Sequence, residues 1–205
     1  MQGVLALPAK PKGLIVFAHG SGSSRFSPRN VEVADALNRA GFGTILLDLL
    51  TREEERDRRN VFDIALLADR LIAAIKWIDE DSELSKIPRG LFGASTGAAA
   101  ALEAAAALGD RVGAVVSRGG RPDLASDALP LVRAPTLLIV GGDDDAVVGL
   151  NEKTLARLRT ETALRIVPGA THLFPEPGAL EAVSQHAEEW FATHLRRADV
   201  ATRSA

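Results

Sequence analysis

The sequence predicts a single α/β domain in which a mostly parallel sheet of about six to seven strands carries helices on both faces. Short apolar, β-branched runs alternate along the chain with longer segments of helical period, which is the order of a parallel sheet with helical crossovers. The runs are apolar throughout, as expected of parallel strands that are buried on both faces. A chain of 205 residues is long enough to bury a sizeable core as one domain.

Six segments are expected to be strands, because each is a short apolar run bounded by glycine, proline or charged residues. They are residues 13–18, 43–48, the run that leads into Ser95, 112–116, 135–140 and 164–167. The sequence shows no internal repeat and no linker. We therefore expect one domain over residues 1–205, with residues 196–205 as a loose C-terminal tail.

Five segments have the pattern of helices. They are residues 31–40, 60–78, 96–108, 151–159 and 177–195. The helix over 60–78 is predicted from apolar residues at helical spacing, among them Ile64, Leu67 and Leu71. The last helix begins near Pro177, a residue that suits the first turn of a helix.

The composition excludes several functional classes. The formal net charge of −3 provides no basic surface for nucleic acid and no polybasic membrane anchor. No apolar stretch reaches the roughly 20 residues that a membrane-spanning helix needs, and the first residues lack the features of a signal peptide. The chain has no cysteine, which rules out disulfides, a thiolate nucleophile and Cys-ligated zinc. We expect a cytoplasmic protein that binds neither nucleic acid nor membrane.

A G-x-S-x-G pattern lies between an apolar run and an alanine-rich helix, with Ser95 at its centre and Gly93 and Gly97 on either side. In a strand–turn–helix context this pattern forms a nucleophile elbow, a sharp turn that holds the serine hydroxyl clear of the sheet. The small neighbours are needed because larger side chains would collide with the adjoining strand and helix. The alternative is a turn of small residues with an incidental serine.

A serine nucleophile needs an adjacent base, and the base needs an orienting acid. Three aspartates, Asp143, Asp144 and Asp145, follow the strand over 135–140, and His172 follows the strand over 164–167. Ligands of open α/β sheets bind beyond the carboxyl ends of the strands, so these side chains stand at the expected edge. Taken one by one, the aspartates could form a solvated acidic turn and the histidine could be an ordinary loop residue. No complementary ligand cluster supports a metal site.

The chain resembles the α/β-hydrolases, and among these it is similar to the small dienelactone-hydrolase-like proteins. The resemblance is carried by FAHGSG (17–22), LDLLT (47–51), GASTG (93–97), SRGGRPD (117–123), VGGDD (140–144) and GATHLF (169–174). It implies an α/β-hydrolase fold, and the stretch from 118 to 133 is too short for the helical cap of larger relatives. Dienelactone hydrolase proper uses a cysteine nucleophile, so its lactone substrate is not carried over to this serine-containing chain.

The resemblance implies a catalytic triad of Ser95 as nucleophile, His172 as base and Asp144 as orienting acid. The family pattern Gly-x-x-Asp-x-x-Val also fits Asp145 when it is counted one residue later. We choose Asp144 because the strand then ends as in relatives. The oxyanion-hole N–H groups are expected from Thr96 and Ser21, with Gly22 or Ser23 as alternatives to Ser21.

Three further features of the chain are interpreted less directly. His19 is expected to support the loop after the first apolar strand rather than to titrate in catalysis. Gly22 and Arg118 are candidates for substrate binding. Arg118 and Arg121 could recognise an anionic substrate group, but a salt bridge to Asp123 or to the acidic turn is the simpler reading.

The segment over 51–60 is rich in charges of both signs and is expected to be a solvated loop that could overhang the site.

Together these features predict a serine hydrolase acting on carboxylic esters, thioesters or related small activated acyl substrates, without a cofactor. A non-catalytic binding module of the same fold, or an acyltransferase that uses the same triad, are the alternatives. Small proteins of this kind occur as monomers and as homodimers, and the sequence does not decide between the two states.

Overall fold

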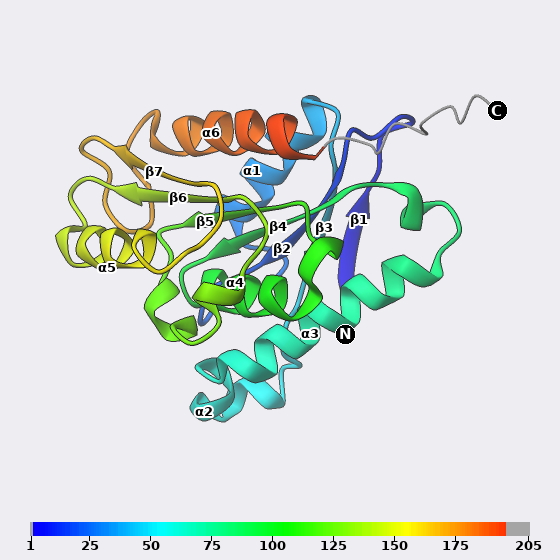
Figure 1. Ribbon diagram of the computed structural model, residues 1–205, viewed down its shortest axis with the longest axis horizontal. Helices are drawn as coiled ribbons and strands as arrows, with labels where there is room; N and C mark the ends of the chain where they lie inside the picture. Colours follow the sequence, from blue (N-terminus) through cyan, green and yellow to red (C-terminus); the bar gives the residue numbers. More distant parts are fainter. Residues whose placement is uncertain (1, 196–205) are drawn as a thin grey trace.

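A computed structural model describes residues 2–195, which form a seven-stranded sheet between two layers of helices (Figure 1). The strand order is β1-β3-β2-β4-β5-β6-β7. Strand β1 runs antiparallel to β3, and the other neighbours are parallel. The strands are β1 Gly3–Ala6, β2 Leu14–Ala18, β3 Gly43–Leu47, β4 Arg89–Ala94, β5 Ala114–Arg118, β6 Thr136–Gly141 and β7 Thr162–Val167. This confirms the expected fold class.

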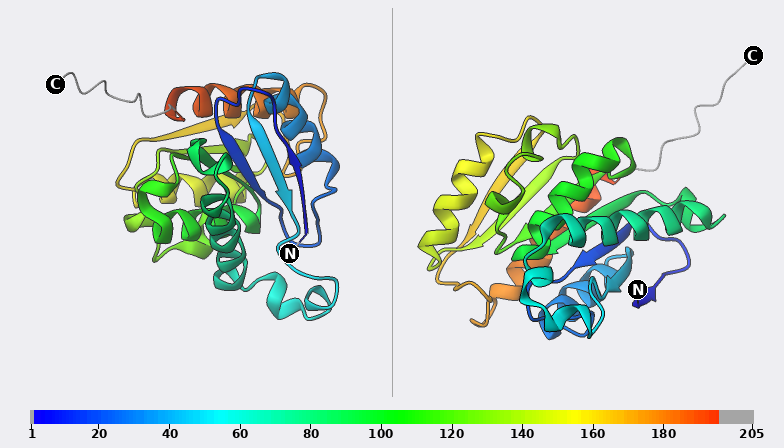
Figure 2. Two further views of the ribbon diagram at one scale, coloured as in Figure 1. Left: turned by 90° about the vertical axis from the view of Figure 1, so that its right-hand side faces the viewer. Right: turned by 90° about the horizontal axis from the view of Figure 1, so that it is seen from below.

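Six α-helices are present in the described residues, and all but α2 cover a face of the sheet. They are α1 Pro28–Arg39, α2 Arg58–Val61, α3 Ile64–Glu80, α4 Thr96–Leu108, α5 Asp145–Leu155 and α6 Ala179–His194. Helices α1 and α6 lie side by side on one face, and α3, α4 and α5 lie on the other, as the views in Figures 1 and 2 show. Between β5 and β6 the chain forms only two short 3₁₀ helices, Pro122–Ala125 and Leu129–Leu131.

The core consists of two clusters, one on each face of the sheet. Successive residues of a strand point to opposite faces, so each central strand contributes to both clusters. Val16 and Leu91 pack beneath α3 and α4, whereas Phe17 and Phe92 pack beneath α1 and α6 with their ring centroids 4.7 Å apart. This two-sided burial explains why the central strands are mostly apolar.

Three elements differ from the sequence-based expectation. Strand β1 was not predicted, because it is a short, largely exposed edge strand without periodic burial. The helix over 60–78 is two helices, since the side chain of Asp63 accepts a hydrogen bond from the N–H of Leu66 and so starts α3 anew. The helix expected over 151–159 is wrong in its bounds, because α5 begins at Asp145 directly after the acidic turn.

The expected loose tail, residues 196–205, lies outside the described residues. Within residues 2–195, no helix combines the length and the apolar character that a membrane span requires.

The packing of α6 on the sheet yields a stability prediction. Phe191 is fully buried, and its ring lies so close to Gly90 that any side chain there would collide with it. We expect Phe191→Ala to lower the free energy of unfolding by about 3–5 kcal/mol, because it removes buried area and leaves a cavity. Leu131→Ala, at a side chain that is 64% exposed, is the control and should change it by less than about 0.5 kcal/mol. Equal losses in denaturant unfolding would contradict this picture of the core.

Candidate active site

Ser95 stands at the sharp turn between β4 and α4. Its backbone has φ 52° and ψ −121°, a conformation that side chains rarely adopt. The two flanking glycines permit the turn. A Cβ at Gly93 would lie 2.4 Å from the Cα of Ala98, and one at Gly97 would lie 2.4 Å from the carbonyl oxygen of Ala18. The G-x-S-x-G spacing is therefore dictated by how closely α4 approaches β4 and the end of β2.

Hydrogen bonds on both sides fix the Ser95 backbone. Its N–H donates to the carbonyl oxygen of Arg118 (3.2 Å), at the end of the neighbouring strand β5. Its own carbonyl oxygen accepts from the N–H groups of Ala98 and Arg121, both at 3.1 Å. The strained turn is thus held by its surroundings, a condition under which such strain persists.

His172 and Asp144 meet at the carboxyl edge of the sheet. The Nδ1 atom of His172 lies 2.7 Å from Oδ2 of Asp144, although 28 residues separate them. Asp143 and Asp145 are both exposed. Of the three candidate aspartates, Asp144 is the one that contacts the imidazole of His172.

The His172 loop lies close to the elbow. A side chain built at Gly119 would contact the carbonyl oxygen of His172 at 3.0 Å and its Cε1 at 3.6 Å. Gly119 directly follows Arg118, whose carbonyl group holds Ser95. In residues 2–195, no hydrogen bond joins the Ser95 hydroxyl to the imidazole. In structures without substrate, such contacts are often long and tighten only when substrate binds.

Backbone strain is concentrated in these two loops. Among the described residues, Ser95 and Phe174 are the non-glycine residues with positive φ, and Phe174 lies two residues after His172. Phe174 is buried and its N–H donates to Thr171 (3.1 Å), which closes the loop tightly. Strained residues of this kind cluster at functional sites.

The loop after β2 lies against Ser95 and opens on a cleft of about 840 Å³. A Cβ at Gly20 would lie 3.0 Å from the Cβ of Ser95. Ser21, Gly22 and Ser23 line the cleft together with Thr96, whose N–H lies in the first turn of α4, where helical N–H groups lack helical partners. The candidates for the oxyanion hole are therefore gathered at one place. The N–H of Ser23 already donates to the carbonyl oxygen of Gly20 (3.3 Å), so Ser21 and Gly22 are the candidates beside Thr96.

The far wall of the cleft comes from the segment after β3. Glu55, Arg58 and Phe62 line it, with Phe26 across the loop after β2. The charged segment over 51–60 therefore contributes to the cleft, and part of it is α2 rather than a plain loop. The half-exposed rings of Phe26 and Phe62 make the cleft partly apolar.

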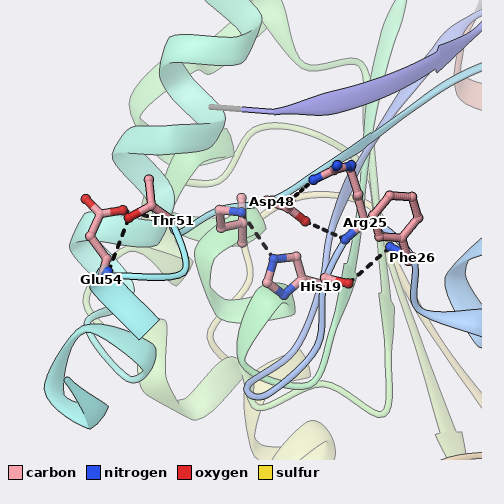
Figure 3. A network of polar contacts seen from close by, with 8 residues as sticks. His19, Arg25, Phe26, Asp48, Thr51 and Glu54 are labelled. Carbon is pink, nitrogen blue, oxygen red and sulfur yellow. Dashed lines mark hydrogen bonds and ion pairs between the residues drawn. The ribbon is translucent and has the colours of Figure 1, made fainter. Parts of the chain in front are cut away.

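His19 supports the loop after β2, as Figure 3 shows. Its Nε2 accepts a hydrogen bond from the N–H of Leu49 (3.1 Å), so the ring proton is on Nδ1, which lies 3.0 Å from the carbonyl oxygen of Gly20. The imidazole thus ties the first residue of the loop to the segment after β3.

A second tie joins Arg25 to Asp48. Asp48 accepts a hydrogen bond from the backbone N–H of Arg25 (2.7 Å) and forms an ion pair with its guanidinium group (Figure 3). Both side chains are largely buried. Sequence reasoning assigned no role to this pair, although the position of Asp48 as the last residue of the predicted strand over 43–48 was the available signal.

The arginine that ends β5, Arg118, and the one in the following loop, Arg121, behave differently. Arg121 forms a bidentate ion pair with Asp123 at 2.7 and 2.8 Å, and this hydrogen bonding lowers the pKa of Asp123. The salt bridge to Asp123 that the sequence suggested is therefore formed by Arg121. The same expectation is wrong for Arg118, which is buried and forms no ion pair in the part of the chain that the structure describes.

No group of three or more His, Asp or Glu side chains within residues 2–195 is arranged to hold a metal ion. The chemistry available at this edge is that of one hydroxyl, one imidazole and one carboxylate, with backbone N–H groups beside them.

Comparison with known proteins decides the family. The sequence model of the dienelactone hydrolase family matches residues 1–196. The chain belongs to the dienelactone hydrolase family. A crystal structure of a dienelactone hydrolase from Anabaena variabilis ATCC 29413 is 56% identical with a TM-score of 0.93, over 95% of this chain and 92% of that chain.

More distant structures share the fold of this dienelactone hydrolase family member. Est1E from Butyrivibrio proteoclasticus is 16% identical with a TM-score of 0.80, over 94% of this chain and 93% of that chain.

Proteins of Mycobacterium tuberculosis strains CDC 1551 / Oshkosh and ATCC 25618 / H37Rv, each named "Putative phosphoribosyl transferase", are 58% identical over 95% of this chain. The chain spans only 44% of the length of these two relatives.

The Arg25–Asp48 tie yields a prediction about loop order. Asp48→Ala leaves the Arg25 guanidinium and N–H without their partner, which we expect to cost about 1–3 kcal/mol of unfolding free energy. Amide hydrogen exchange over residues 20–27 should become faster. Lys86→Ala, which breaks an exposed pair with Glu83, should leave exchange in this loop unchanged. Unaltered exchange in the Asp48 variant would show that the loop does not depend on this contact.

Proposed function

We propose that this protein is a serine hydrolase that cleaves carboxylic esters, thioesters or related small activated acyl compounds through an acyl-enzyme. The observation that carries the proposal is the 2.7 Å contact between His172 and Asp144, at the same sheet edge as the strained Ser95. Membership of the dienelactone hydrolase family supports the same class of reaction.

The proposed mechanism follows from the tautomer of His172. Its Nδ1–H donates to the Asp144 carboxylate, so Nε2 presents a lone pair and can take the proton of the Ser95 hydroxyl. The serine oxygen attacks the acyl carbon, and the protonated imidazole returns the proton to the leaving group. Water then attacks the acyl-enzyme by the same route, which releases the acid and restores the hydroxyl.

The charge that develops on the carbonyl oxygen needs preorganised donors. We assign this role to the N–H groups of Thr96 and Ser21, which line the same cleft. The ties of His19 to Leu49 and of Arg25 to Asp48 then position the loop that carries Ser21.

The open cleft favours small acyl groups. Only short 3₁₀ helices connect β5 and β6, so no helical cap covers the site from that connection. The rings of Phe26 and Phe62 offer apolar contact at the rim. We further propose that the phosphoribosyl transferase activity named for the longer mycobacterial relatives resides in the part of them that this chain does not match.

The test of the proposed nucleophile and base is turnover of 4-nitrophenyl acetate. Ser95→Ala and His172→Ala should each lower kcat by about 10⁴-fold or more, because the triad acts as a unit. Ser82→Ala and His186→Ala remove the same residue types elsewhere and should retain the wild-type rate. A fluorophosphonate probe should label wild type and fail to label Ser95→Ala. Equal turnover in all five proteins would end the assignment, and labelling of neither protein would favour a non-catalytic module.

The acidic turn offers a sharper test of the proposed triad. Asp144→Asn should lower kcat by about 10³–10⁴-fold, because an amide no longer holds the imidazole in the required tautomer. Asp143→Asn and Asp145→Asn have the same change at exposed neighbours and should stay within about twofold of wild type. A larger loss in Asp145→Asn than in Asp144→Asn would assign the acid to the other residue.

A further inference from the structure

Arg118 is a buried cation without a counter-ion. Only 6% of the residue is exposed, and its Nη1 is buried with no hydrogen-bond partner. It stands two residues after Val116, which packs beneath α1 and α6, so the alternation of the strand directs Arg118 to that same face. A buried N–H donor of this kind costs folding free energy, because it loses its bond to water and gains no other partner.

A second arginine lies beside it. Arg29 is in the first turn of α1, which covers this face of the sheet. Its Nε is also buried without a partner. Burial, and then the positive charge of Arg29, lower the pKa of Arg118 to about 10, since both disfavour a second positive charge at this place.

Local structure gives no reason for this pair. Within residues 2–195, neither arginine forms an ion pair or a side-chain hydrogen bond, whereas Arg25 and Arg121 each have an aspartate. The first turn of α1 contains no acidic residue, and the positive end of the helix dipole disfavours a cation there. Two like charges placed together destabilise the fold, so we expect that they serve to bind a ligand.

The pair adjoins the proposed active site. Arg29 lines the cleft that also holds Ser21 and Thr96. The carbonyl oxygen of Arg118 accepts the hydrogen bond from the Ser95 N–H. Arg29 thus faces the cleft of the proposed oxyanion hole, and the backbone of Arg118 holds the proposed nucleophile.

We propose that Arg29 and Arg118 form a binding site for an oxoanion, a carboxylate or a phosphate, carried by the substrate. The inference rests on the proposed hydrolase function and names its substrate class: small esters or thioesters with a negatively charged group. Guanidinium forks match the paired oxygens of either anion, and the N-terminus of α1 adds a favourable dipole.

The experiment compares two esters that differ in one charge, mono-4-nitrophenyl adipate and its neutral methyl ester. Wild type should have the higher kcat/KM for the charged ester. The ratio of the two values should fall about tenfold or more in Arg29→Met and Arg118→Met, since each removes a charged hydrogen-bonding group. Arg39→Met, an exposed arginine at the opposite end of α1, is the matched control and should keep the wild-type ratio.

Competition distinguishes the two anions. Adipate and inorganic phosphate are tested as inhibitors of the neutral ester, at an ionic strength matched with chloride. Inhibition by adipate would identify the ligand group as a carboxylate, and inhibition by phosphate would identify it as a phosphate. In each case the inhibition must be lost in both arginine variants. No charge preference and no inhibition in wild type, or a preference that survives in both variants, would overturn the proposal.

A stability readout keeps the site testable if esterase activity is absent. Arg118→Met replaces an unpaired buried cation by an apolar side chain, so its Tm should rise by about 2–4 °C. The preferred anion should raise the Tm of wild type and not that of the variant. If the neutral ester is not hydrolysed and Ser95 is not labelled, the hydrolase proposal fails, while an anion-dependent Tm would still support the site. Hydrolysis without any anion effect would refute this inference alone.

Discussion

The close approach of α4 to the end of β2 is the constraint on which the site depends. At Gly97 the backbone of the helix comes so near to Ala18 and His19 that no side chain fits between them. The chain can make this contact only by turning sharply at Ser95, and the positive φ of that residue is the result. The same contact brings the loop after β2 against Ser95, so one packing requirement both exposes the proposed nucleophile and places the proposed oxyanion donors beside it.

The loops around the elbow are ordered by polar contacts between distant segments. His19 and Asp48 each reach across from one strand end to another, and each satisfies a backbone N–H that would otherwise lack a partner. The side-chain contact between His172 and Asp144 ties the loop after β7 to the turn after β6. Parallel strands end at one edge of the sheet, which is why segments far apart in the chain can be tied together there.

The arginines of the protein divide by whether their charge is neutralised. Arg25 and Arg121 are satisfied by carboxylates and their roles are complete within the fold. Arg29 and Arg118 repel each other and leave buried donors unpaired. The cost of this arrangement fits a site in which part of the binding is supplied by the ligand, consistent with the trade-off between stability and function seen at many active sites.

The sequence by itself determined the fold class, the elbow and the chain order of serine, aspartate and histidine. These follow from local patterns: apolar runs for β2 to β7, small residues around Ser95, and polar residues directly after strands. The sequence did not predict the edge strand β1 or the break before α3 at Asp63. An exposed strand and a single capping hydrogen bond have little effect on the spacing of apolar residues along the chain.

Only the tertiary structure decided which member of each candidate set makes the expected contact. Asp144 and Asp145 fit the same spacing, but one of them faces His172. Arg118 and Arg121 lie three residues apart in the sequence, but of the two only Arg121 bonds to Asp123. These choices depend on side-chain directions and on contacts between segments far apart in the chain, which no local pattern of residues encodes.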